Sequence, residues 1–264
     1  MDEFRGHWAL VTGASSGIGK EFARQLSARG LNLALTARDQ AALDQLAKDL
    51  AAEQGIEAKA FAIDLSQPRA AAALRARLAE AEIPIRLLIN NAAFGRWGRF
   101  EDSEADTYEA MIGLNATALV SLCHHFLPDL ARFPTSAVIN VSSPAALQPV
   151  PYMAVYAASK AFVHSFSQAL HGEWQDKGVT VHTLVPGPTQ SAFDERAGAY
   201  GSALSEKRDP PALAVKAAIG QLGGKKPLIT SAKGTGKQRL FASLAPPSMV
   251  IKQVAKMFRP PQPT

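Results

Sequence analysis

Short apolar segments alternate along the chain with longer segments of helical period, and this alternation constrains the fold more than any other feature. The apolar segments are continuous rather than alternating in polarity, which predicts strands covered by helices on both faces. We therefore expect a doubly wound, Rossmann-type α/β fold, with a parallel sheet between two layers of helices. The expected strands are residues 8–11, 32–36, 58–63, 87–89, 137–141 and 179–185, and the expected helices are residues 20–29, 40–54, 69–81, 106–132 and 155–176.

Size and composition indicate a single domain. The chain has 264 residues, of which 47% are hydrophobic, and this is enough for one large core. The expected elements before residue 190 are joined by short connections. We expect residues 1–245 to form one domain, with a polar, aperiodic loop or lid at residues 190–208, and residues 246–264 to form a basic amphipathic tail.

Charge and cysteine content exclude several classes of protein. The net charge is +5, but nine basic residues and no acidic residue lie between residues 210 and 264. This segment lacks the interleaved aromatic residues that stack on bases, so we expect no nucleic-acid partner. The single cysteine, Cys123, excludes an internal disulfide, and no histidine pair has the spacing of a helical zinc site, so we expect no metal. We expect a cytoplasmic protein with neither a signal peptide nor an apolar run long enough to span a bilayer.

A glycine-rich turn follows the first expected strand and opens the first expected helix. It reads Thr12-Gly-Ala-Ser-Ser-Gly-Ile-Gly19. Glycines let the backbone approach a ligand closely, and the N-terminal amides of a helix bind anions. The spacing suits the pyrophosphate of a dinucleotide, and an ordinary turn that happens to hold three glycines is the alternative.

The end of the second expected strand bears on which dinucleotide would bind. It reads Thr36-Ala37-Arg38-Asp39. A guanidinium makes paired bonds to a 2′-phosphate, whereas an acid holds the ribose 2′-hydroxyl. Because Arg38 comes first, we expect NADP(H) in preference to NAD(H). Because of Asp39, NAD(H) is the alternative cofactor. A second alternative is that Arg38 and Asp39 form only a solvated salt bridge and do not select a cofactor.

Tyr156 and Lys160 lie four residues apart, which on a helix places them on one face. A tyrosine with its ordinary pKa of about 10 is a poor acid–base catalyst at neutral pH. An adjacent cation stabilises the phenolate and brings that pKa toward the working range. By itself the pair is equally consistent with a surface Tyr and Lys, but the glycine turn strengthens the catalytic interpretation.

Taken together, these motifs resemble the short-chain dehydrogenase/reductase family in its classical form, over roughly residues 6 to 195. They occur in the order and spacing of that family, and the segments 32–38 and 151–156 are most similar to a bacterial branch. The motifs are Thr12-Gly-Ala-Ser-Ser-Gly-Ile-Gly19, Asp64-Leu65, Asn90-Asn91-Ala92, Asn115, Val141-Ser142-Ser143, Tyr156 with Lys160, and Pro186-Gly187-Pro188-Thr189.

The resemblance implies roles for the candidate catalytic residues. Tyr156 would be the general acid/base, and Lys160 would lower its pKa and hold the nicotinamide ribose. Ser143 would bond the substrate oxygen, with Ser142 as the alternative. Asn115 would anchor a water relay that returns protons to Lys160.

The resemblance also implies a cofactor site. Asp64 would meet the adenine amine, Asn91 would line the adenosine side, and Thr189 with the backbone near residues 185–187 would take the carboxamide. The candidate cofactor residues are Gly13, Ser15, Ser16, Gly17, Ile18, Gly19, Arg38, Asp64, Leu65, Asn91, Ala92, Tyr156, Lys160, Pro186, Gly187 and Thr189. One departure is visible, because Ala93 stands where the family usually has glycine, and this matters if that residue needs a positive φ.

These residues predict an NADP(H)-dependent carbonyl reductase or alcohol dehydrogenase. We expect an apolar ketone, aldehyde or secondary alcohol as substrate, because apolar residues cluster in the segments around the expected pocket. The alternatives are an NAD-linked secondary-alcohol dehydrogenase and a non-catalytic nucleotide-binding protein, which would need none of Ser143, Tyr156 and Lys160. A homodimer or homotetramer is implied by the resemblance. The residues expected at the pocket mouth are Phe94, Trp97, Phe100, Leu147, Val150, Tyr152, Met153 and Phe193.

The C-terminal tail predicts a short amphipathic helix. We expect Ser248 to cap it and Arg259 to end it. Its apolar side would hold Val250, Ile251, Val254, Met257 and Phe258, and its other side would hold Lys252, Lys256 and Arg259. This apolar face would either pack on the domain near the pocket mouth or make a weak, salt-sensitive contact with an anionic membrane.

Overall fold

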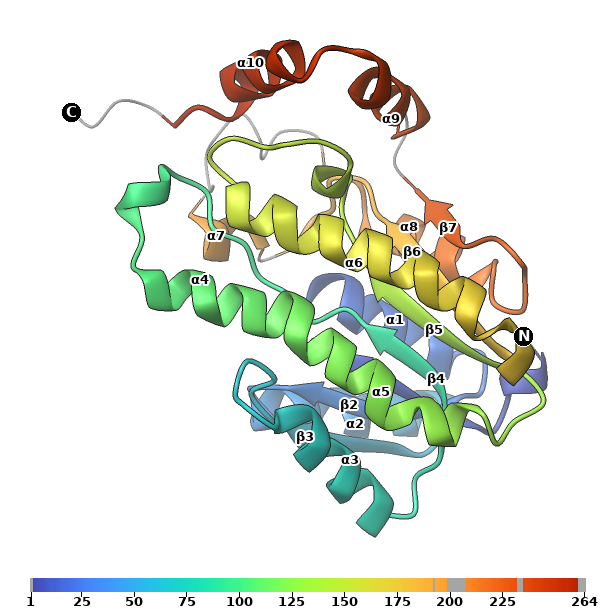
Figure 1. Cartoon of the computed structure of the whole chain (residues 1–264). Coiled ribbons are helices and arrows are strands. Elements are labelled where there is room, and N and C mark those ends of the chain that lie inside the picture. Colours follow the sequence, from blue (N-terminus) through green and yellow to red (C-terminus); the bar gives the residue numbers. More distant parts are fainter. Residues whose placement is uncertain (1, 192, 199–207, 232–234, 261–264) are drawn as a thin grey trace.

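The computed structural model describes residues 2–191, 193–198, 208–231 and 235–260. Its centre is a seven-stranded sheet in the order β3-β2-β1-β4-β5-β6-β7, in which every neighbouring pair is parallel (Figure 1). The strands are β1 (Trp8–Thr12), β2 (Asn32–Ala37), β3 (Ala58–Ala62), β4 (Ile85–Asn90), β5 (Ser136–Val141), β6 (Val179–Val185) and β7 (Leu228–Thr230).

Helices cover both faces of the sheet, which confirms the doubly wound α/β fold. One buried cluster joins the sheet to α1, α2 and α8, and a second joins it to α3, α5 and α6. In Figure 1 the first layer lies behind the sheet and the second lies in front of it. The α-helices are α1 (Gly17–Ser27), α2 (Gln40–Gln54), α3 (Ala70–Glu80), α4 (Ala105–Ile112), α5 (Leu119–Leu130), α6 (Ala154–Glu173), α7 (Phe193–Ala197), α8 (Pro211–Ile219), α9 (Thr235–Leu244) and α10 (Pro247–Phe258).

Several elements differ from those expected. The helix expected at residues 106–132 is α4 and α5 joined by a π-helical turn, Gly113–Ala118. The helix expected to reach residue 176 ends at Glu173 and is followed by a 3-10 turn, Gln175–Lys177. Strand β7 was not predicted from the sequence, because three residues are too few to show a strand pattern.

The segment expected to be a lid contains the short helix α7. The rest of that prediction, at residues 192 and 199–207, lies outside the described residues. The tail is helical as expected, but α10 begins one residue before Ser248 and its N-cap is Pro246, so the predicted serine cap is wrong.

The continuous helical stretch Ala105–Leu130 is long and apolar enough to cross a bilayer by length and composition, contrary to the sequence analysis. Its buried side chains, including Leu122, Phe126 and Leu130, belong to the core cluster between α3, α6 and the sheet. Core helices of globular proteins pass the same test.

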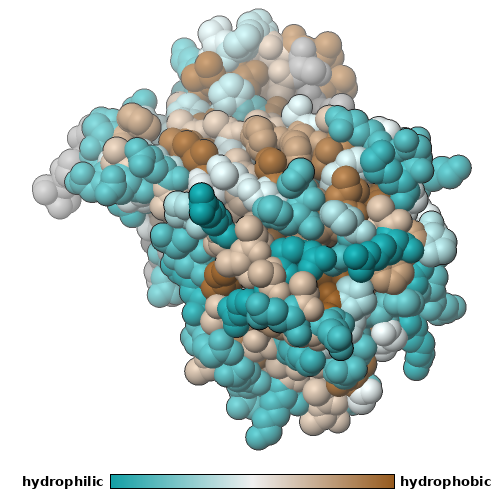
Figure 2. Space-filling model, turned by 60° about the horizontal axis from the view of Figure 1, so that its bottom comes forward, coloured by the Kyte–Doolittle hydropathy of each residue, from teal (hydrophilic) through white to brown (hydrophobic). Residues whose placement is uncertain are grey.

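The end of the molecule that carries α3 and β3 has a mainly hydrophilic surface. Figure 2, which brings this end forward, shows hydrophobic side chains gathered in the upper half of the view instead. The exposed apolar surface therefore lies mostly away from this end.

Candidate active site

The carboxyl ends of the parallel strands meet at one edge of the sheet. The order of the strands reverses between β1 and β4, whose outer neighbours are β2 and β5. Ligands of doubly wound sheets bind outside the carboxyl ends of the strands at such a switch point. The glycine turn after β1, the Asn91 segment after β4 and the serines after β5 are therefore brought to one place.

The glycine turn fits an anion such as a pyrophosphate. Gly13 and Gly17 have positive φ angles of 65° and 52°. A Cβ at Gly19 would lie 2.2 Å from the carbonyl oxygen of Gly13, so only glycine fits there. Ser16 is the N-cap of α1 but makes no side-chain capping bond, which leaves amides at the helix N-terminus available to an anion. Three predicted cofactor residues of the turn, Ser15, Ser16 and Ile18, are half-buried.

Asn91 ties this turn to β4. Its Nδ2 donates to the carbonyl oxygens of Thr12 at 2.9 Å and Gly13 at 3.3 Å. The backbone amides of Asn91 and Ala92 both donate to the Thr12 hydroxyl oxygen. The amide donor of Asn91 is thus used to hold the turn, a structural role that the sequence analysis did not anticipate.

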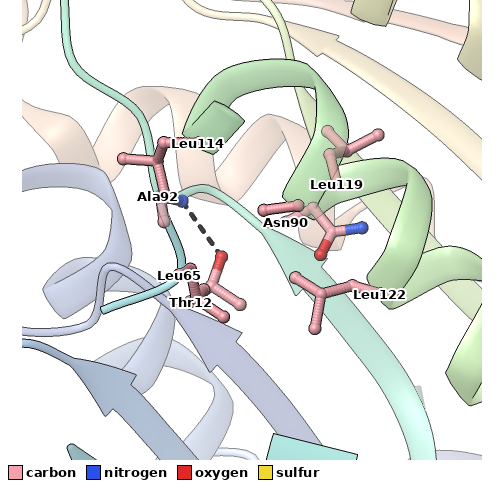
Figure 3. A pocket seen from close by; sticks show the side chains of 8 residues that line it. Thr12, Leu65, Asn90, Ala92, Leu114, Leu119 and Leu122 are labelled. Carbon is pink, nitrogen blue, oxygen red and sulfur yellow. Dashed lines mark hydrogen bonds between the residues drawn. The ribbon is translucent and has the colours of Figure 1, made fainter. Parts of the chain in front are cut away.

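A small cavity lies beside the glycine turn, between Thr12, Leu65, Ala92 and the π turn (Figure 3). Its volume of about 10 Å³ is room for a single water molecule and far too little for a nucleotide ring. In Figure 3 the amide oxygen of Asn90 points toward the space between Thr12 and Leu122. This buried oxygen has no hydrogen-bond partner among the described residues. The cavity therefore lies among the residues that pack beneath the site, and it is not the pocket that holds the ligand.

The residues that follow β2 and β3 are those expected to contact an adenosine. Arg38 is exposed, and in the described part of the chain no ion pair joins it to Asp39. The carboxylate of Asp39 instead accepts from the Ala42 amide at 3.0 Å and caps α2. This removes the predicted salt-bridge alternative. Leu65, which follows β3, is buried.

Asp64 is half-buried after β3, and two effects of opposite sign act on its pKa. Partial burial raises the pKa. Two hydrogen bonds from Ser66, a third from Gln67 and the charge of Arg38 lower it more, so the pKa lies below its ordinary value. Asp64 is therefore ionised at neutral pH, and its carboxylate can accept a hydrogen bond from an amine.

Tyr156 and Lys160 lie together in the first turns of α6. The Lys160 ammonium lies 6.0 Å from the centre of the Tyr156 ring, and its Nζ donates to the carbonyl oxygen of Val141 at 2.8 Å. The lysine side chain is buried, and this burial lowers its pKa to about 8. The helical spacing of the sequence thus brings the two groups together as expected.

Ser142 and Ser143 differ in what their hydroxyl groups contact. Ser142 is buried, and its hydroxyl donates to the carbonyl oxygen of Lys160 at 3.0 Å. Ser143 is half-buried at the start of the 3-10 turn Pro144–Leu147, and its oxygen accepts from the Ala145 amide. Ser143 therefore keeps its own proton available for a ligand, whereas the Ser142 proton is used within the protein.

Asn115 lies inside the π turn and joins two parts of the site. Its Nδ2 donates to the Phe94 carbonyl oxygen at 2.9 Å and to the Ser159 hydroxyl oxygen at 3.0 Å. Its Oδ1 accepts from the Phe94 amide. The Ser159 hydroxyl in turn donates to the carbonyl oxygen of Tyr156. Asn115 therefore fixes the segment after β4 against the helix that carries Tyr156, and π turns of this kind are frequent at functional sites.

The predicted carboxamide site lies after β6. Pro186, Gly187 and Thr189 are buried, and the Thr189 hydroxyl donates to the Gly187 carbonyl oxygen at 2.7 Å. The Gly187 amide donates to the hydroxyl oxygen of Ser231, which follows β7. Ser231 was not predicted from the sequence, because no local pattern pairs residues 44 positions apart.

An apolar cluster, called here the mouth cluster, borders Tyr156. Its buried members are Val150, Met153, Ala157, Val250 and Val254, and the side chains packed against them are Trp97, Ala145, Tyr156, Phe193, Ala245 and Phe258. Four of the residues expected at the pocket mouth belong to it, namely Trp97, Val150, Met153 and Phe193. Residues of α10 belong to it as well, so this helix packs on the domain, which was one of the two alternatives for the tail.

Phe100 does not join the mouth cluster, so its expected place is wrong. Its side chain is 63% exposed and stacks on Tyr108 with ring centroids 4.9 Å apart. Phe94 lines a separate, more polar cavity with Arg96 and Ser103. The Ala93 departure is harmless to the backbone: the non-glycine residues with positive φ in the described chain are Arg69, Glu82 and Tyr152.

Known proteins resemble this chain in sequence and structure. "Very-long-chain 3-oxoacyl-CoA reductase" of Bos taurus is 33% identical over 189 residues, which cover 69% of this chain and 59% of that protein, so the chain spans less than two thirds of this relative. A short-chain dehydrogenase from Sphingobium yanoikuyae, solved in complex with NADPH, is 32% identical, with coverage of 91% of this chain and 96% of that chain and a TM-score of 0.80.

A third similar protein is the "bulky-bulky ketone specific alcohol dehydrogenase" from Comamonas testosteroni. It is 32% identical, with coverage of 85% of each chain and a TM-score of 0.74. The model of the family described as "short chain dehydrogenase" matches residues 7–199, which hold the glycine turn and Tyr156 with Lys160. This chain belongs to the short chain dehydrogenase family.

Proposed function

We propose that this protein is an NADP(H)-dependent oxidoreductase that interconverts bulky apolar ketones and secondary alcohols. The observation that carries the proposal is the position of Tyr156, whose ring centre lies 6.0 Å from a buried ammonium group and whose side chain packs against the mouth cluster. A proton donor beside a group of apolar side chains is the arrangement that reduction of an apolar carbonyl compound requires.

Each residue of the site would have its own role in the reaction. A bound nicotinamide supplies or accepts the hydride. In reduction, the Tyr156 hydroxyl gives its proton to the carbonyl oxygen, and the Lys160 charge stabilises the phenolate that remains. Ser143 donates a hydrogen bond to the same oxygen. Asn115 and Ser159 hold the start of α6, so that Tyr156 keeps its orientation.

The preference for NADP(H) rests on the end of β2. Arg38 supplies an exposed positive charge there, and the carboxylate that would favour NAD(H), Asp39, is used to cap α2. The NADPH complex of the similar Sphingobium yanoikuyae enzyme supports the same choice. NAD(H) stays the alternative to be measured.

The mouth cluster supports a bulky apolar substrate. Two buried valines of α10 and four aromatic side chains contribute to it. The Comamonas testosteroni relative is named for bulky ketones, which suits this composition. A 3-oxoacyl thioester is the second candidate, because the Bos taurus relative is named for such a substrate.

A substrate panel tests the proposal. The purified protein is given NADPH or NADH with small ketones, bulky aromatic ketones and 3-oxoacyl-CoA thioesters, and oxidation of the nicotinamide is followed by its absorbance. We expect turnover of bulky ketones with NADPH. Faster turnover with NADH would favour the NAD-linked alternative. Binding of NADPH with no turnover of any carbonyl compound would favour a non-catalytic nucleotide-binding protein.

We also propose that the protein forms a homodimer or homotetramer. On the outer side of α6, Phe162 is 46% exposed and stacks on Phe166, with ring centroids 5.7 Å apart. Ile112 of α4 is exposed as well. Exposed apolar side chains on adjacent helices favour contact with a second copy. Light scattering of the wild type and of Phe162→Glu measures the mass, and a monomeric wild type would contradict the proposal.

A further inference from the structure

Exposed apolar side chains are concentrated at the C-terminal end of the chain. Of ten large apolar side chains that are exposed in the described structure, six lie on α9 and α10, with exposed fractions from 39% to 75%. These six, called here the C-terminal patch, are Leu240, Phe241, Leu244, Met249, Ile251 and Met257. This corrects the predicted face of α10, because Val250 and Val254 are buried while Ile251 and Met257 are not. Exposed patches of this kind mark contact with a partner or a membrane.

The chain segment that carries the patch has charge of one sign. Lys252, Lys256 and Arg259 are exposed on or beside α10. No acidic residue occurs anywhere from residue 210 to the end of the chain. Apolar side chains flanked by lysines match the interface of an anionic bilayer, where acyl chains lie next to negative headgroups.

The same charge argues against a second copy of this chain as the occupant. A two-fold interface places a patch against itself. The basic side chains of this segment would then face one another, and the segment itself supplies no acidic partner for them. An anionic lipid surface supplies the opposite charge, and we propose that the C-terminal patch binds such a membrane.

The patch is fixed beside the candidate active site. On the inner side of α10, Val250 and Val254 belong to the mouth cluster, and the Trp97 indole donates to the Phe258 carbonyl oxygen at 2.8 Å. Figure 1 shows α9 and α10 together at the top of the molecule, outside the start of α6. A membrane bound to the outer side of these helices would therefore lie near the mouth cluster, to which Tyr156 belongs.

This placement has a consequence for substrate access, which rests on the proposed function. Bulky apolar ketones partition into bilayers, so an enzyme held at the interface meets them at high local concentration. α9 and α10 span only 10 and 12 residues, so the contact is peripheral, and much of its strength comes from charge. Binding is therefore expected to fall as salt screens the lysines.

Vesicle sedimentation with the full chain tests the inference. The wild type is mixed with phosphatidylglycerol/phosphatidylcholine vesicles or with phosphatidylcholine vesicles at low and high salt. We expect it to sediment with the anionic vesicles at low salt and to stay in the supernatant with the neutral ones. Loss of two lysines in Lys252→Gln/Lys256→Gln is expected to lower the partition coefficient about 30-fold, from roughly 1 kcal/mol for each lysine near the surface.

Two further variants separate the apolar part of the patch from general surface effects. Leu244→Ser/Met257→Ser is expected to lose binding to anionic vesicles. Leu213→Ser is the matched control, because Leu213 is 52% exposed on α8, outside the patch, and it is expected to bind as the wild type does. Circular dichroism and NADPH titration verify that each variant is folded.

The outcomes distinguish this inference from the proposed function. A wild type that stays in the supernatant with anionic vesicles at low salt overturns the inference, even if soluble ketones are reduced. Equal loss in the Leu213→Ser control overturns the role of the patch. A change of mass in light scattering for Leu244→Ser/Met257→Ser, without a change in sedimentation, overturns it in favour of self-association. Sedimentation as expected without turnover of any ketone supports the patch while the proposed function fails.

Discussion

Phe193 of α7 packs its ring against that of Tyr156, with centroids 5.1 Å apart and planes inclined at 52°. The Phe193 ring also lies close to Gly95, where an added Cβ would be 2.5 Å from the tip of the ring. A segment whose sequence is polar and aperiodic therefore places one aromatic side chain directly on the candidate proton donor.

Phe193→Ala is expected to weaken binding of bulky ketones. Loss of a half-buried aromatic contact is worth about 1–2 kcal/mol, or roughly 5- to 30-fold in KM. KM for a small ketone is expected to change much less, because it does not reach this ring. Steady-state kinetics measures both, with Phe100→Ala as the matched control, because Phe100 stacks on Tyr108 instead. Equal changes in KM for both ketones would show that Phe193 is not a substrate contact.

Tyr156→Phe is expected to abolish turnover while the protein still binds its cofactor. The substitution removes the transferable proton but keeps the ring that packs on Phe193. Proton transfer of this kind contributes roughly 10²–10⁴-fold to the rate. Kinetics and NADPH titration measure the two effects. Tyr108→Phe, which loses only a hydrogen bond to the Phe100 carbonyl oxygen, is the control. A kcat close to that of the wild type would remove Tyr156 from the mechanism.

Arg38→Leu is expected to weaken NADPH binding and to leave NADH binding unchanged. The charge-assisted bonds of a guanidinium to a 2′-phosphate contribute about 1.5–3 kcal/mol, or roughly 10- to 150-fold in Kd. Fluorescence titration with both cofactors measures this. Asp39→Asn is the control, since asparagine also caps a helix and so keeps α2 intact. Equal losses for both cofactors would mean that Arg38 has a structural role.

The buried ammonium of Lys160 is expected to make stability depend on pH. Burial lowers its pKa from 10.5 to about 8, so the unfolded chain holds this proton at pH values where the folded protein has released it. The cost of burying the charge is fully present below about pH 8 and disappears as pH rises through the unfolded value. The free energy of unfolding therefore gains about 3 kcal/mol from this group over that range.

Urea unfolding without cofactor, from about pH 7 to about pH 10, measures this gain as the difference between wild type and Lys160→Met. We expect the difference to shift in favour of the wild type as pH rises. Lys48→Met, which removes an exposed lysine on α2, is the control. A difference that stays constant with pH would contradict the assignment.

Ala93→Gly, which restores the usual residue of the family, is expected to bring no gain in activity. Ala93 does not adopt a positive φ, so the backbone has no need of glycine there. Glycine would instead give the unfolded chain more freedom and lower the free energy of unfolding by about 0.4–1 kcal/mol. Urea unfolding and kinetics measure both quantities. A rise in kcat would show that the methyl group obstructs the site.

The local pattern of the sequence determined the parallel sheet, its layers of helices and the glycine turn. It also determined the shared face of Tyr156 and Lys160. Strand and helix periods act over a few residues, so they can be read without knowing what lies across the fold. The sequence did not predict the π turn around Asn115, because a single extra backbone residue per turn leaves the apolar period of the helix almost unchanged.

Only the tertiary structure decided which side chains complete the site. It brought the Val141 carbonyl oxygen into a hydrogen bond with Lys160 and the Ser231 hydroxyl into one with the Gly187 amide. It also packed the Phe193 ring against that of Tyr156. It also divided the apolar residues of α10 into two valines buried in the mouth cluster and three side chains left exposed, Met249, Ile251 and Met257. These contacts join residues far apart in the chain, and they depend on how helix and strand faces pack together. Local periodicity determines the faces themselves but not the partner that each face meets.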